Sequence, residues 1–127
     1  MEDLTTYEQS FGGIGRLFGQ NNFTKLTHSH VVIVGIGGVG SWCAESLVRS
    51  GVGSVTLADP DDICITNTNR QLHTQASTIG KSKVEVMKNR LLAINPDLKI
   101  QTISEFITEK NIQQIIEIKP DYVVDAI

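Results

Sequence analysis

The residues with the clearest chemical potential are the glycines of the segment Gly35–Gly40. Gly35, Gly37 and Gly40 have the spacing GxGxxG, and Gly38 adds a fourth glycine. The segment follows an apolar stretch and precedes a helical pattern, so that the N–H groups at the start of the helix can face an anion. This context favours phosphate or nucleotide binding. The alternative is a tight glycine turn that serves packing alone.

An acidic residue follows at the distance that a nucleotide site requires. Asp59 lies 19 residues beyond Gly40, and an acid about 20 residues after the glycines can accept hydrogen bonds from ribose hydroxyls. On these two features alone, an NAD-dependent enzyme is the default interpretation. The alternative for Asp59 is structural, as the first residue of the turn Asp59–Asp62.

A cluster of positive charge distinguishes this sequence from a dinucleotide-binding one. Residues 70–90 contain one acid and five basic residues, in a chain of net charge −3. The basic residues are Arg70, Lys81, Lys83, Lys88 and Arg90. Arg can hold two phosphate oxygens and Lys acts as a point charge, which suits a triphosphate better than a pyrophosphate. We expect functional roles for Arg70 and Lys83 and a solvated helix face for Lys88 and Arg90, and we leave Lys81 open between the two.

Alternating strand and helix patterns must position these residues. An unbroken β-branched run predicts a strand at 31–34, and we expect further strands at 54–58, 99–103 and 121–127. Helical spacing predicts helices at 41–50 and 81–94, and a third helix that carries Ile112, Ile115 and Ile116 after an N-cap at Thr108. This order predicts an α/β fold, with a Rossmann-like, mostly parallel sheet and helices on both faces.

Two regions flank or interrupt these elements. Residues 1–27 are polar and rich in glycine, and we interpret them as an N-terminal arm with a short helix at Gln20–Leu26. Residues 28–127 then form the nucleotide-binding domain. The polar connection 60–80 is long for a compact domain, so it is expected to be functional.

Composition and charge exclude several classes of protein. The 127 residues are 40% hydrophobic and 20% charged, which argues against disorder and coiled coils. No apolar run approaches the roughly 18 residues that a membrane span needs, and the acidic start Met1–Leu4 is unlike a secretory signal. Cys43 and Cys64 form neither a CxxC motif nor a zinc spacing. A reduced, cytoplasmic protein with no membrane partner is the simplest interpretation.

The combined motifs resemble the E1-like adenylating family, which includes ubiquitin-activating enzymes and bacterial enzymes of thiamine and molybdopterin sulfur transfer. The matching stretches follow in family order: Gly35–Gly40, Gly51–Gly53, Asp59–Asp61, Asn67–Gln71, Gly80–Lys83 and Asn95-Pro96. They cover most of residues 31–127 and are far more specific together than the glycine motif alone. The resemblance implies the N-terminal half of an ATP-binding, E1-like fold.

Two details are similar to one branch of that family, the tRNA threonylcarbamoyladenosine dehydratases. These are the arm sequence Phe11–Gly19 and the stretch Thr66–Gln71, which follows the sequence Val39–Trp42. The resemblance implies an enzyme that uses ATP to activate the carboxylate of a threonylcarbamoyl group on a tRNA adenosine, followed by cyclisation with overall loss of water. It also implies a homodimer, a tRNA substrate and a sulfur-transfer protein as a further partner.

Three alternative functions stay open at this point. The first is E1-like activation of a ubiquitin-like sulfur-carrier protein. The second is an NAD(P)-dependent oxidoreductase, which gives Arg70 and Lys83 no role. The third is a nucleotide-binding module without catalysis.

The resemblance assigns the first part of an ATP site. Gly35, Gly37, Gly38 and Gly40 would lie along the ATP phosphates, and Asp59 would hold the ribose hydroxyls.

The later motifs supply the rest of that site. Asn67, Arg70 and Lys83 would contact the phosphates, with Gln71 in the same nucleotide site. Arg70 and Lys83 would also stabilise charge as the substrate carboxylate attacks the α-phosphorus and pyrophosphate leaves. Asp61 is a weaker candidate on the adenine side.

The N-terminal arm offers one more candidate. Arg16 resembles an arginine that the family uses at the nucleotide, in some members supplied by the partner subunit; the alternative is a surface residue on a mobile arm. The family often has an arginine before Phe11-Gly12, where this chain has Ser10. We expect packing rather than base stacking for Trp42, and a surface or packed role rather than a place in the site for His73.

The resemblance also bears on the length of the chain. In the family, the strand that ends here at Ile127 is followed at once by an Asp that binds the magnesium of Mg-ATP. Mg²⁺ is therefore expected as a cofactor beside ATP, and no residue of this sequence is assigned to it. We expect the chain to be a truncated N-terminal half, inactive alone, whose tRNA contacts come from the basic stretch 70–90 or from a missing region.

Overall fold

A single parallel sheet organises the chain in the computed structural model, which describes residues 5–127. The strands lie in the order β3-β2-β1-β4 and are all parallel. Their bounds are β1 His30–Val34, β2 Ser54–Ala58, β3 Lys99–Ile103 and β4 Tyr122–Asp125. The strand order reverses at β1, because β2 and β3 add on one side and β4 on the other. The carboxyl ends of strands at such a point are where open α/β sheets bind ligands.

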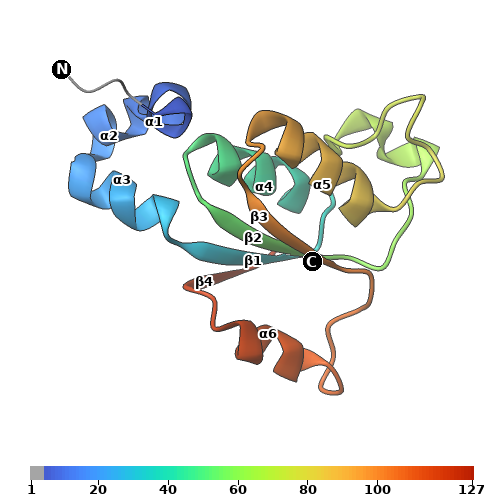
Figure 1. The fold of residues 1–127 in the computed structure, drawn as a ribbon. Helices are drawn as coiled ribbons and strands as arrows, with labels where there is room; N and C mark the ends of the chain where they lie inside the picture. Colours follow the sequence, from blue (N-terminus) through green and yellow to red (C-terminus); the bar gives the residue numbers. More distant parts are fainter. Residues whose placement is uncertain (1–4) are drawn as a thin grey trace.

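Helices cover both faces of the sheet, as the sequence predicts (Figure 1). Helices α4 (Gly40–Arg49) and α5 (Lys83–Ile94) lie on one face, and α6 (Ile112–Ile118) lies on the other. The long connection after β2 contains a short 3-10 helix, η1 (Ile65–Asn69). The predicted Rossmann-like α/β class is therefore confirmed.

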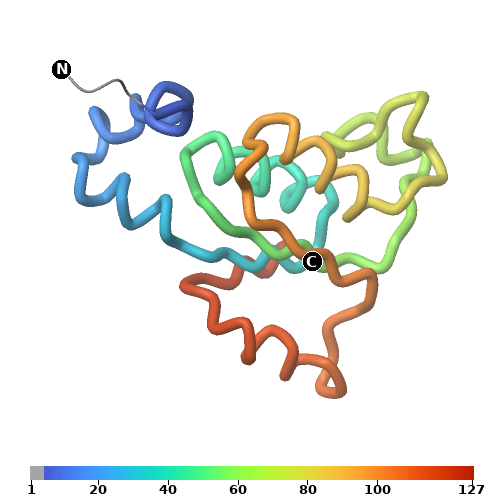
Figure 2. The backbone as a smooth tube through the Cα atoms, in the orientation of Figure 1, coloured from blue at the N-terminus to red at the C-terminus, as the bar shows by residue number. Residues whose placement is uncertain are grey.

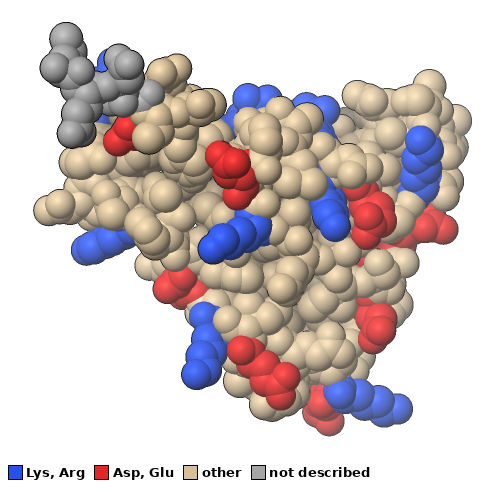
Figure 3. Space-filling view, in the orientation of Figure 1, with Lys and Arg blue, Asp and Glu red and all other residues tan. Residues whose placement is uncertain are grey.

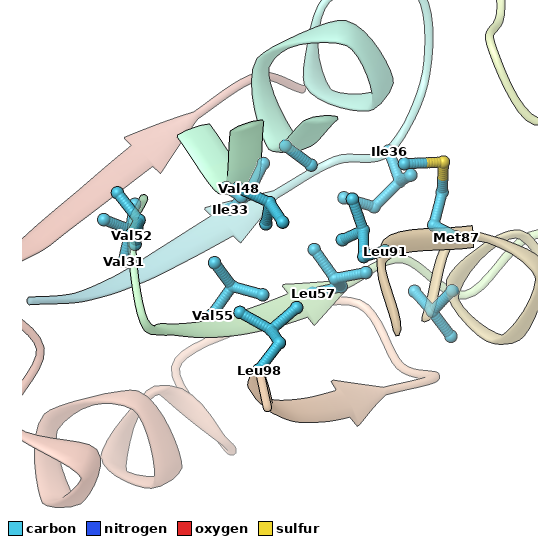
Figure 4. Close-up of a cluster of buried hydrophobic side chains, with 12 residues drawn as sticks. Val31, Ile33, Ile36, Val48, Val52, Val55, Leu57, Met87, Leu91 and Leu98 are labelled. Carbon is cyan, nitrogen blue, oxygen red and sulfur yellow. The ribbon is translucent and has the colours of Figure 1, made fainter. Parts of the chain in front are cut away.

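The core lies between the sheet and the pair α4 and α5 (Figure 4). Val31 and Ile33 of β1 and Leu57 of β2 point into it, and Met87 and Leu91 of α5 close it. Val32, between two of these residues, is also fully buried, on the opposite face of the sheet. The unbroken β-branched run of β1 is thus buried on both faces, as expected for a central parallel strand.

Two helices begin later than the sequence patterns indicate. Helix α5 begins at Lys83 rather than at residue 81, because the Ser82 side chain accepts a hydrogen bond from the Glu85 N–H and caps the helix. Helix α6 begins at Ile112, with Asn111 as its N-cap. Thr108 is not that cap: its N–H donates to Asn111 Oδ1 at 2.7 Å and forms a turn before the helix.

The N-terminal arm is more ordered than its composition indicates. Its described part folds into α1 (Thr6–Phe11), α2 (Gly13–Phe18) and α3 (Gln20–Thr27), of which only the last was expected. These helices lie beside the end of the sheet where β1 begins (Figure 2). The predicted boundary between residues 27 and 28 stays a prediction, and residues 1–4, including the acidic start, lie outside the described residues.

Aromatic residues attach the arm to the domain. Phe11 and Phe23 are buried, and the Tyr7 hydroxyl donates a hydrogen bond to the Gly51 carbonyl. Gly51 has φ +93°, and a Cβ there would lie 2.9 Å from the Phe23 ring. The turn before β2 must therefore be glycine at this position, both for its backbone conformation and for contact with the arm.

Candidate functional site

The glycine-rich segment forms a tight turn from β1 into α4. Gly35 has φ +94°, and a Cβ there would lie 2.7 Å from the Ala126 carbonyl oxygen after β4. A Cβ on Gly40 would overlap the Gly35 carbonyl oxygen. Gly37 and Gly38 have room for a Cβ, with side-chain atoms no nearer than 3.4 Å. The first pair is therefore required by the turn itself, whereas the second pair leaves the backbone open to a ligand.

Asp59 at the carboxyl end of β2 holds two loops together. Its side chain is mostly buried, and its Oδ2 accepts the Ile36 N–H at 2.8 Å. Its Oδ1 accepts the Asp61 N–H, also at 2.8 Å. The structural role that the sequence left as an alternative is therefore present. Each carboxylate oxygen can accept a second hydrogen bond, so the ribose role stays a prediction.

Lys83 is buried at the start of α5 and faces the same loop. Its side chain is 9% exposed, and its Nζ lies 3.9 Å from Asp61 Oδ2, on a side chain that is 62% exposed. Its N–H donates to the Asp61 carbonyl at 3.1 Å. A buried ammonium with one solvated partner retains capacity to bind an anion, because a poorly solvated charge attracts opposite charge strongly.

Arg70 and Gln71 lie directly over the glycine loop. Arg70 Cγ would be 3.4 Å from a Cβ on Gly38, and Gln71 Nε2 would be 3.5 Å from a Cβ on Gly37. The Arg70 guanidinium is exposed and donates to Asn69 Oδ1 at 2.9 Å. Gln71 is buried, and its Oε1 has no hydrogen-bond partner among the described residues. An unpaired buried amide oxygen beside the loop can accept a hydrogen bond from a ligand or water.

Asn67 is predicted to contact phosphate, but its described contacts are structural. Its Oδ1 accepts the Cys64 N–H at 2.8 Å, and its backbone N–H donates to the Cys64 carbonyl at 2.9 Å. Its carbonyl accepts the N–H groups of both Arg70 and Gln71. Asn67 thus shapes η1 and the turn that presents Arg70; the phosphate contact stays a prediction.

Three residues that were not assigned to the site connect this turn to the loop. Trp42 Nε1 donates to the Arg70 carbonyl at 2.9 Å, and Ser41 Oγ accepts the Leu72 N–H at 3.2 Å. His73 is almost fully buried, with Nε2 2.7 Å from the Ile36 carbonyl oxygen, and burial lowers its pKa. The burial of His73 agrees with a packed role. Trp42, which was expected to pack, is instead 52% exposed.

A cavity of about 240 Å³ opens at the carboxyl ends of the strands. It is lined by residues of the glycine loop and of the segments after β2, β3 and β4: Gly35, Gly37, Asp59, Pro60, Asp61, Lys83, Glu105, Phe106, Ile107, Ala126 and Ile127. Phe106 is 71% exposed at its rim, an aromatic surface that the sequence analysis missed. Its only signal was its place, three residues after a strand. The cavity brings the predicted Asp59, Asp61 and Lys83 together.

Arg16 does not join these residues within one copy of the chain. It lies on α2, exposed, and lines a separate hollow with Glu8 and Gln20. The arm lies at the end of the sheet where β1 begins (Figure 1), whereas the cavity opens at the carboxyl ends of the strands. A role for Arg16 at the nucleotide therefore needs a second copy of the chain.

The basic stretch 70–90 does not form one charged surface. Lys83 is buried in the cavity, and Arg90 Nε lies 2.6 Å from Glu45 Oε1 on α4. Acidic and basic side chains are interspersed over the face shown in Figure 3. The stretch is therefore divided between the cavity, an ion pair and the surface, so it is not the continuous basic surface that nucleic acid prefers.

The two cysteines and the acidic residues show no metal site within residues 5–127, where no group of three His, Cys, Asp or Glu side chains could hold a metal ion. Burial raises the pKa of the Cys43 thiol. The Thr66 hydroxyl donates to Cys64 Sγ at 3.2 Å and lowers the pKa of that exposed thiol.

The fold and this site define the class of protein. The chain belongs to the ThiF family, whose pattern matches residues 13–127. The E1-like resemblance in the sequence is thereby confirmed. Among the helices of residues 5–127, none is long and apolar enough to cross a membrane.

Two individual relatives show which members of the family this chain is similar to. The chain is 49% identical to the tRNA threonylcarbamoyladenosine dehydratase of Haemophilus influenzae over 127 residues, all of this chain and 49% of the relative. It is 34% identical over 102 residues to the sulfur carrier protein ThiS adenylyltransferase of Escherichia coli, which covers 80% of this chain and 40% of that protein. The chain therefore spans about half the length of the curated relatives it matches.

A solved structure resembles the whole described fold. The Escherichia coli tRNA N6-threonylcarbamoyladenosine dehydratase, TcdA, in complex with ATP superposes with a TM-score of 0.94 at 42% identity. The match covers 100% of this chain and 52% of that one. The predicted class, an E1-like Rossmann fold in its N-terminal half, is thus confirmed.

Proposed function

We propose that this chain carries the ATP-binding part of an enzyme that adenylates the carboxylate of threonylcarbamoyladenosine in tRNA. The observation that carries the proposal is the placement of Arg70 over the glycine loop and of Lys83 in the cavity beside Asp59. The high identity to a dehydratase over the whole chain supports the same substrate class.

The proposed reaction has two steps, adenylation of the carboxylate and then ring closure. A carboxylate oxygen of the threonylcarbamoyl group attacks the α-phosphorus of ATP, and pyrophosphate leaves. A nucleophile within the same threonylcarbamoyl unit then displaces AMP and closes a ring, so that the modified adenosine loses water overall. The chain would contribute positioning and positive charge, which dominate in transfers of this kind.

Each site residue has a role in this proposal. The N–H groups of Gly37 and Gly38 contact the phosphates, and Asp59 accepts hydrogen bonds from the ribose hydroxyls. Lys83 holds phosphate oxygens from the cavity floor and Arg70 from above the loop, where both can stabilise charge on the departing pyrophosphate.

Asp61, Glu105 and Phe106 line the cavity beyond the ribose. That position suits the adenine ring, which can pack against the exposed Phe106 side chain.

Mg²⁺ belongs to the proposal as a companion of ATP. Magnesium in such sites keeps several waters and binds one or two carboxylates together with the phosphates. Within residues 5–127, no group of three His, Cys, Asp or Glu side chains could hold a metal ion without the nucleotide, so magnesium would bind only together with the ATP phosphates.

A homodimer, a cytoplasmic location and a sulfur-transfer partner complete the proposal. The dimer rests on the family resemblance; within one copy of the chain Arg16 lies apart from the cavity, so its expected role at the nucleotide would require a second copy. The partner rests on the family resemblance alone.

A second candidate function is activation of a sulfur-carrier protein. The similarity to a ThiS adenylyltransferase favours it. Both candidates predict exchange of labelled pyrophosphate into ATP, but they differ in the carboxylate that the exchange requires.

Pyrophosphate exchange therefore tests the proposal. In a polypeptide of the relatives' full length that contains these residues, we expect exchange with tRNA that carries threonylcarbamoyladenosine, no exchange with unmodified tRNA, and loss of exchange in R70A and K83A. The 127 residues alone are expected to bind ATP without exchange. Exchange that needs a sulfur-carrier protein would favour the second candidate. No exchange with either substrate, despite ATP binding, would indicate a nucleotide-binding module. Unchanged rates in both variants would show that the site is wrongly assigned.

A further inference from the structure

The side chain of Trp42 lies at the surface where packing does not account for it. It is the single tryptophan of the sequence, and it stands in the first turn of α4, directly after the glycine loop. Its side chain is 52% exposed. The indole is therefore not part of the buried core, and its described contact is a hydrogen bond.

The described hydrogen bond of the indole reaches the backbone of a site residue. Trp42 Nε1 donates to the Arg70 carbonyl at 2.9 Å, across 28 positions of sequence. Arg70 itself has few constraints on its side chain, which is exposed and bonded to Asn69 and, at 3.4 Å, to the Thr66 carbonyl. The position of the guanidinium therefore depends on how firmly the Arg70 backbone is held.

Two neighbouring contacts show that this backbone is held as a unit with the loop. Ser41, next to Trp42, donates from Oγ to the Gly37 carbonyl at 2.5 Å and accepts the Leu72 N–H. His73 contacts the loop through the Ile36 carbonyl. At Arg70 itself, the Asn67 carbonyl accepts the N–H at 3.2 Å within the same turn, and Trp42 holds the carbonyl from helix α4.

From these contacts we infer that Trp42 is a positioning residue for Arg70. It holds the Arg70 carbonyl against α4, so that the guanidinium is already above Gly38 when the phosphates of ATP bind. Preorganisation of this kind lowers the entropic cost of immobilising a long side chain. The inference rests on the proposed function, because it requires that Arg70 contacts phosphate.

Substitution of Trp42 by Phe tests the inference, because it keeps an aromatic ring and removes the donor. The matched control is S46A, which removes a hydrogen bond of the same kind on the same helix, from Ser46 Oγ to the Trp42 carbonyl at 2.8 Å. ATP affinity would be measured by calorimetry, and adenosine affinity by competition against ATP. Amide hydrogen exchange of peptides over residues 70–74 would report on the segment without ligand.

We expect W42F to weaken ATP binding by about two- to tenfold, the effect of losing one hydrogen bond, and to leave adenosine binding unchanged. Amide hydrogen exchange over residues 70–74 should become faster in W42F and not in S46A. The selective loss of triphosphate affinity separates positioning of Arg70 from a general loss of structure, which would weaken both ligands.

Each other outcome overturns the inference in a distinguishable way. Unchanged amide hydrogen exchange over residues 70–74 in W42F means that Trp42 does not hold this segment. Equal losses of ATP and adenosine affinity, or equal losses in S46A, mean a merely structural role. ATP binding by W42F at wild-type affinity overturns the inference alone. Absence of ATP binding by the unaltered chain overturns the proposed function, and the inference with it.

Discussion

Arg70 and Lys83 differ in their surroundings, and this difference predicts which of them would bind ATP more strongly under the proposed function. Lys83 is buried beside the exposed carboxylate of Asp61, whereas the Arg70 guanidinium is exposed. A charge that is shielded from water interacts more strongly with an incoming anion than a solvated one. Lys83 is therefore expected to contribute more to affinity, and Arg70 to depend on preorganisation.

Replacement of Lys83 should weaken ATP binding severely. In K83M the buried stem is retained and the charge is lost, so that a charge-assisted hydrogen bond of about 1.5–3 kcal/mol disappears. We expect affinity to fall about ten- to a hundredfold in calorimetric titrations. Lys81 is exposed and two residues away, so K81M serves as the control and should lose less than about twofold. Equal effects of the two variants would refute the assignment of Lys83.

Asp59 is expected to matter for stability as well as for binding. Its carboxylate accepts the N–H groups of Ile36 and Asp61, and D59A would leave these donors without their partner. We expect the free energy of unfolding in urea to fall by about 3 kcal/mol. The exposed neighbour Asp62 gives the control variant D62A, with a change below about 0.5 kcal/mol. A stable D59A chain that still fails to bind ATP would assign Asp59 to the ribose alone.

The buried His73 should make stability depend on pH. Because burial lowers its pKa below the ordinary value of 6.5, the unfolded chain takes up a proton on acidification before the folded chain does. Stability is therefore fully present above about pH 6.5 and declines as the pH falls toward the lower, folded-state pKa. Unfolding measured between pH 7 and 5 should show a shallower decline in H73Q. The exposed His28 provides the control H28Q; an unchanged slope in H73Q would contradict this account.

In the turn from β1 to α4, different glycines are expected to serve folding and ligand binding. A Cβ on Gly40 would overlap the Gly35 carbonyl, whereas a Cβ on Gly37 meets nothing nearer than 3.5 Å. We expect G40A to lower the melting temperature by several degrees, in keeping with an overpacking cost of about 1–3 kcal/mol. G37A should melt as the unaltered chain does and bind ATP at least about tenfold more weakly, because its methyl group would occupy the path of a phosphate.

The control for these glycine variants is G13A, in the arm, where a Cβ would meet no atom within 4 Å. It should change neither melting nor ATP binding. Normal ATP affinity in G37A would show that the phosphates do not pass along the loop.

The sequence predicts the sheet well, for a physical reason. The strands Ser54–Ala58 and Lys99–Ile103 have the predicted bounds. Each is a short segment that contains β-branched residues and lies close to a breaking residue, Gly53 and Pro60 for the first and Pro96 for the second. Helix starts were less accurate, since both Thr108 and Asn111 can cap. The choice between them depends on turn contacts that a local pattern does not reveal.

The candidate site was predictable only where a motif fixes the spacing. The glycine loop, Asp59 and Lys83 meet at one cavity, because the carboxyl ends of parallel strands share one edge. The contact of Trp42 with Arg70 spans 28 positions and belongs to no motif. Phe106 also belongs to no motif. It lines the cavity because of the course that the chain takes after β3.

The whole molecule combines a cavity at the carboxyl ends of the strands with a mixed surface charge. The net charge is −3, and Figure 3 shows acidic groups among the basic ones. Affinity for nucleic acid depends on clustered Lys and Arg that release counterions from phosphates. The described surface therefore supports ATP binding more directly than tRNA binding, and the tRNA part of the proposal rests on the relatives.

Apolar side chains are exposed on the edge strand β4 and on the neighbouring helix α6. Tyr122 and Val123 on the edge strand β4 are 69% and 53% exposed, and Ile116 on α6 is 56% exposed. Exposed apolar groups on an edge strand favour pairing with further chain or with another copy. The relatives, which are about twice as long as this chain, possess additional sequence that could cover such a surface.

Calorimetric titration of the chain with ATP and, separately, with NAD tests the central claim most directly. We expect ATP to bind at one site per chain, with affinity that K83M reduces, and NAD to give no comparable heat. Tight NAD binding with no response to ATP would contradict the account.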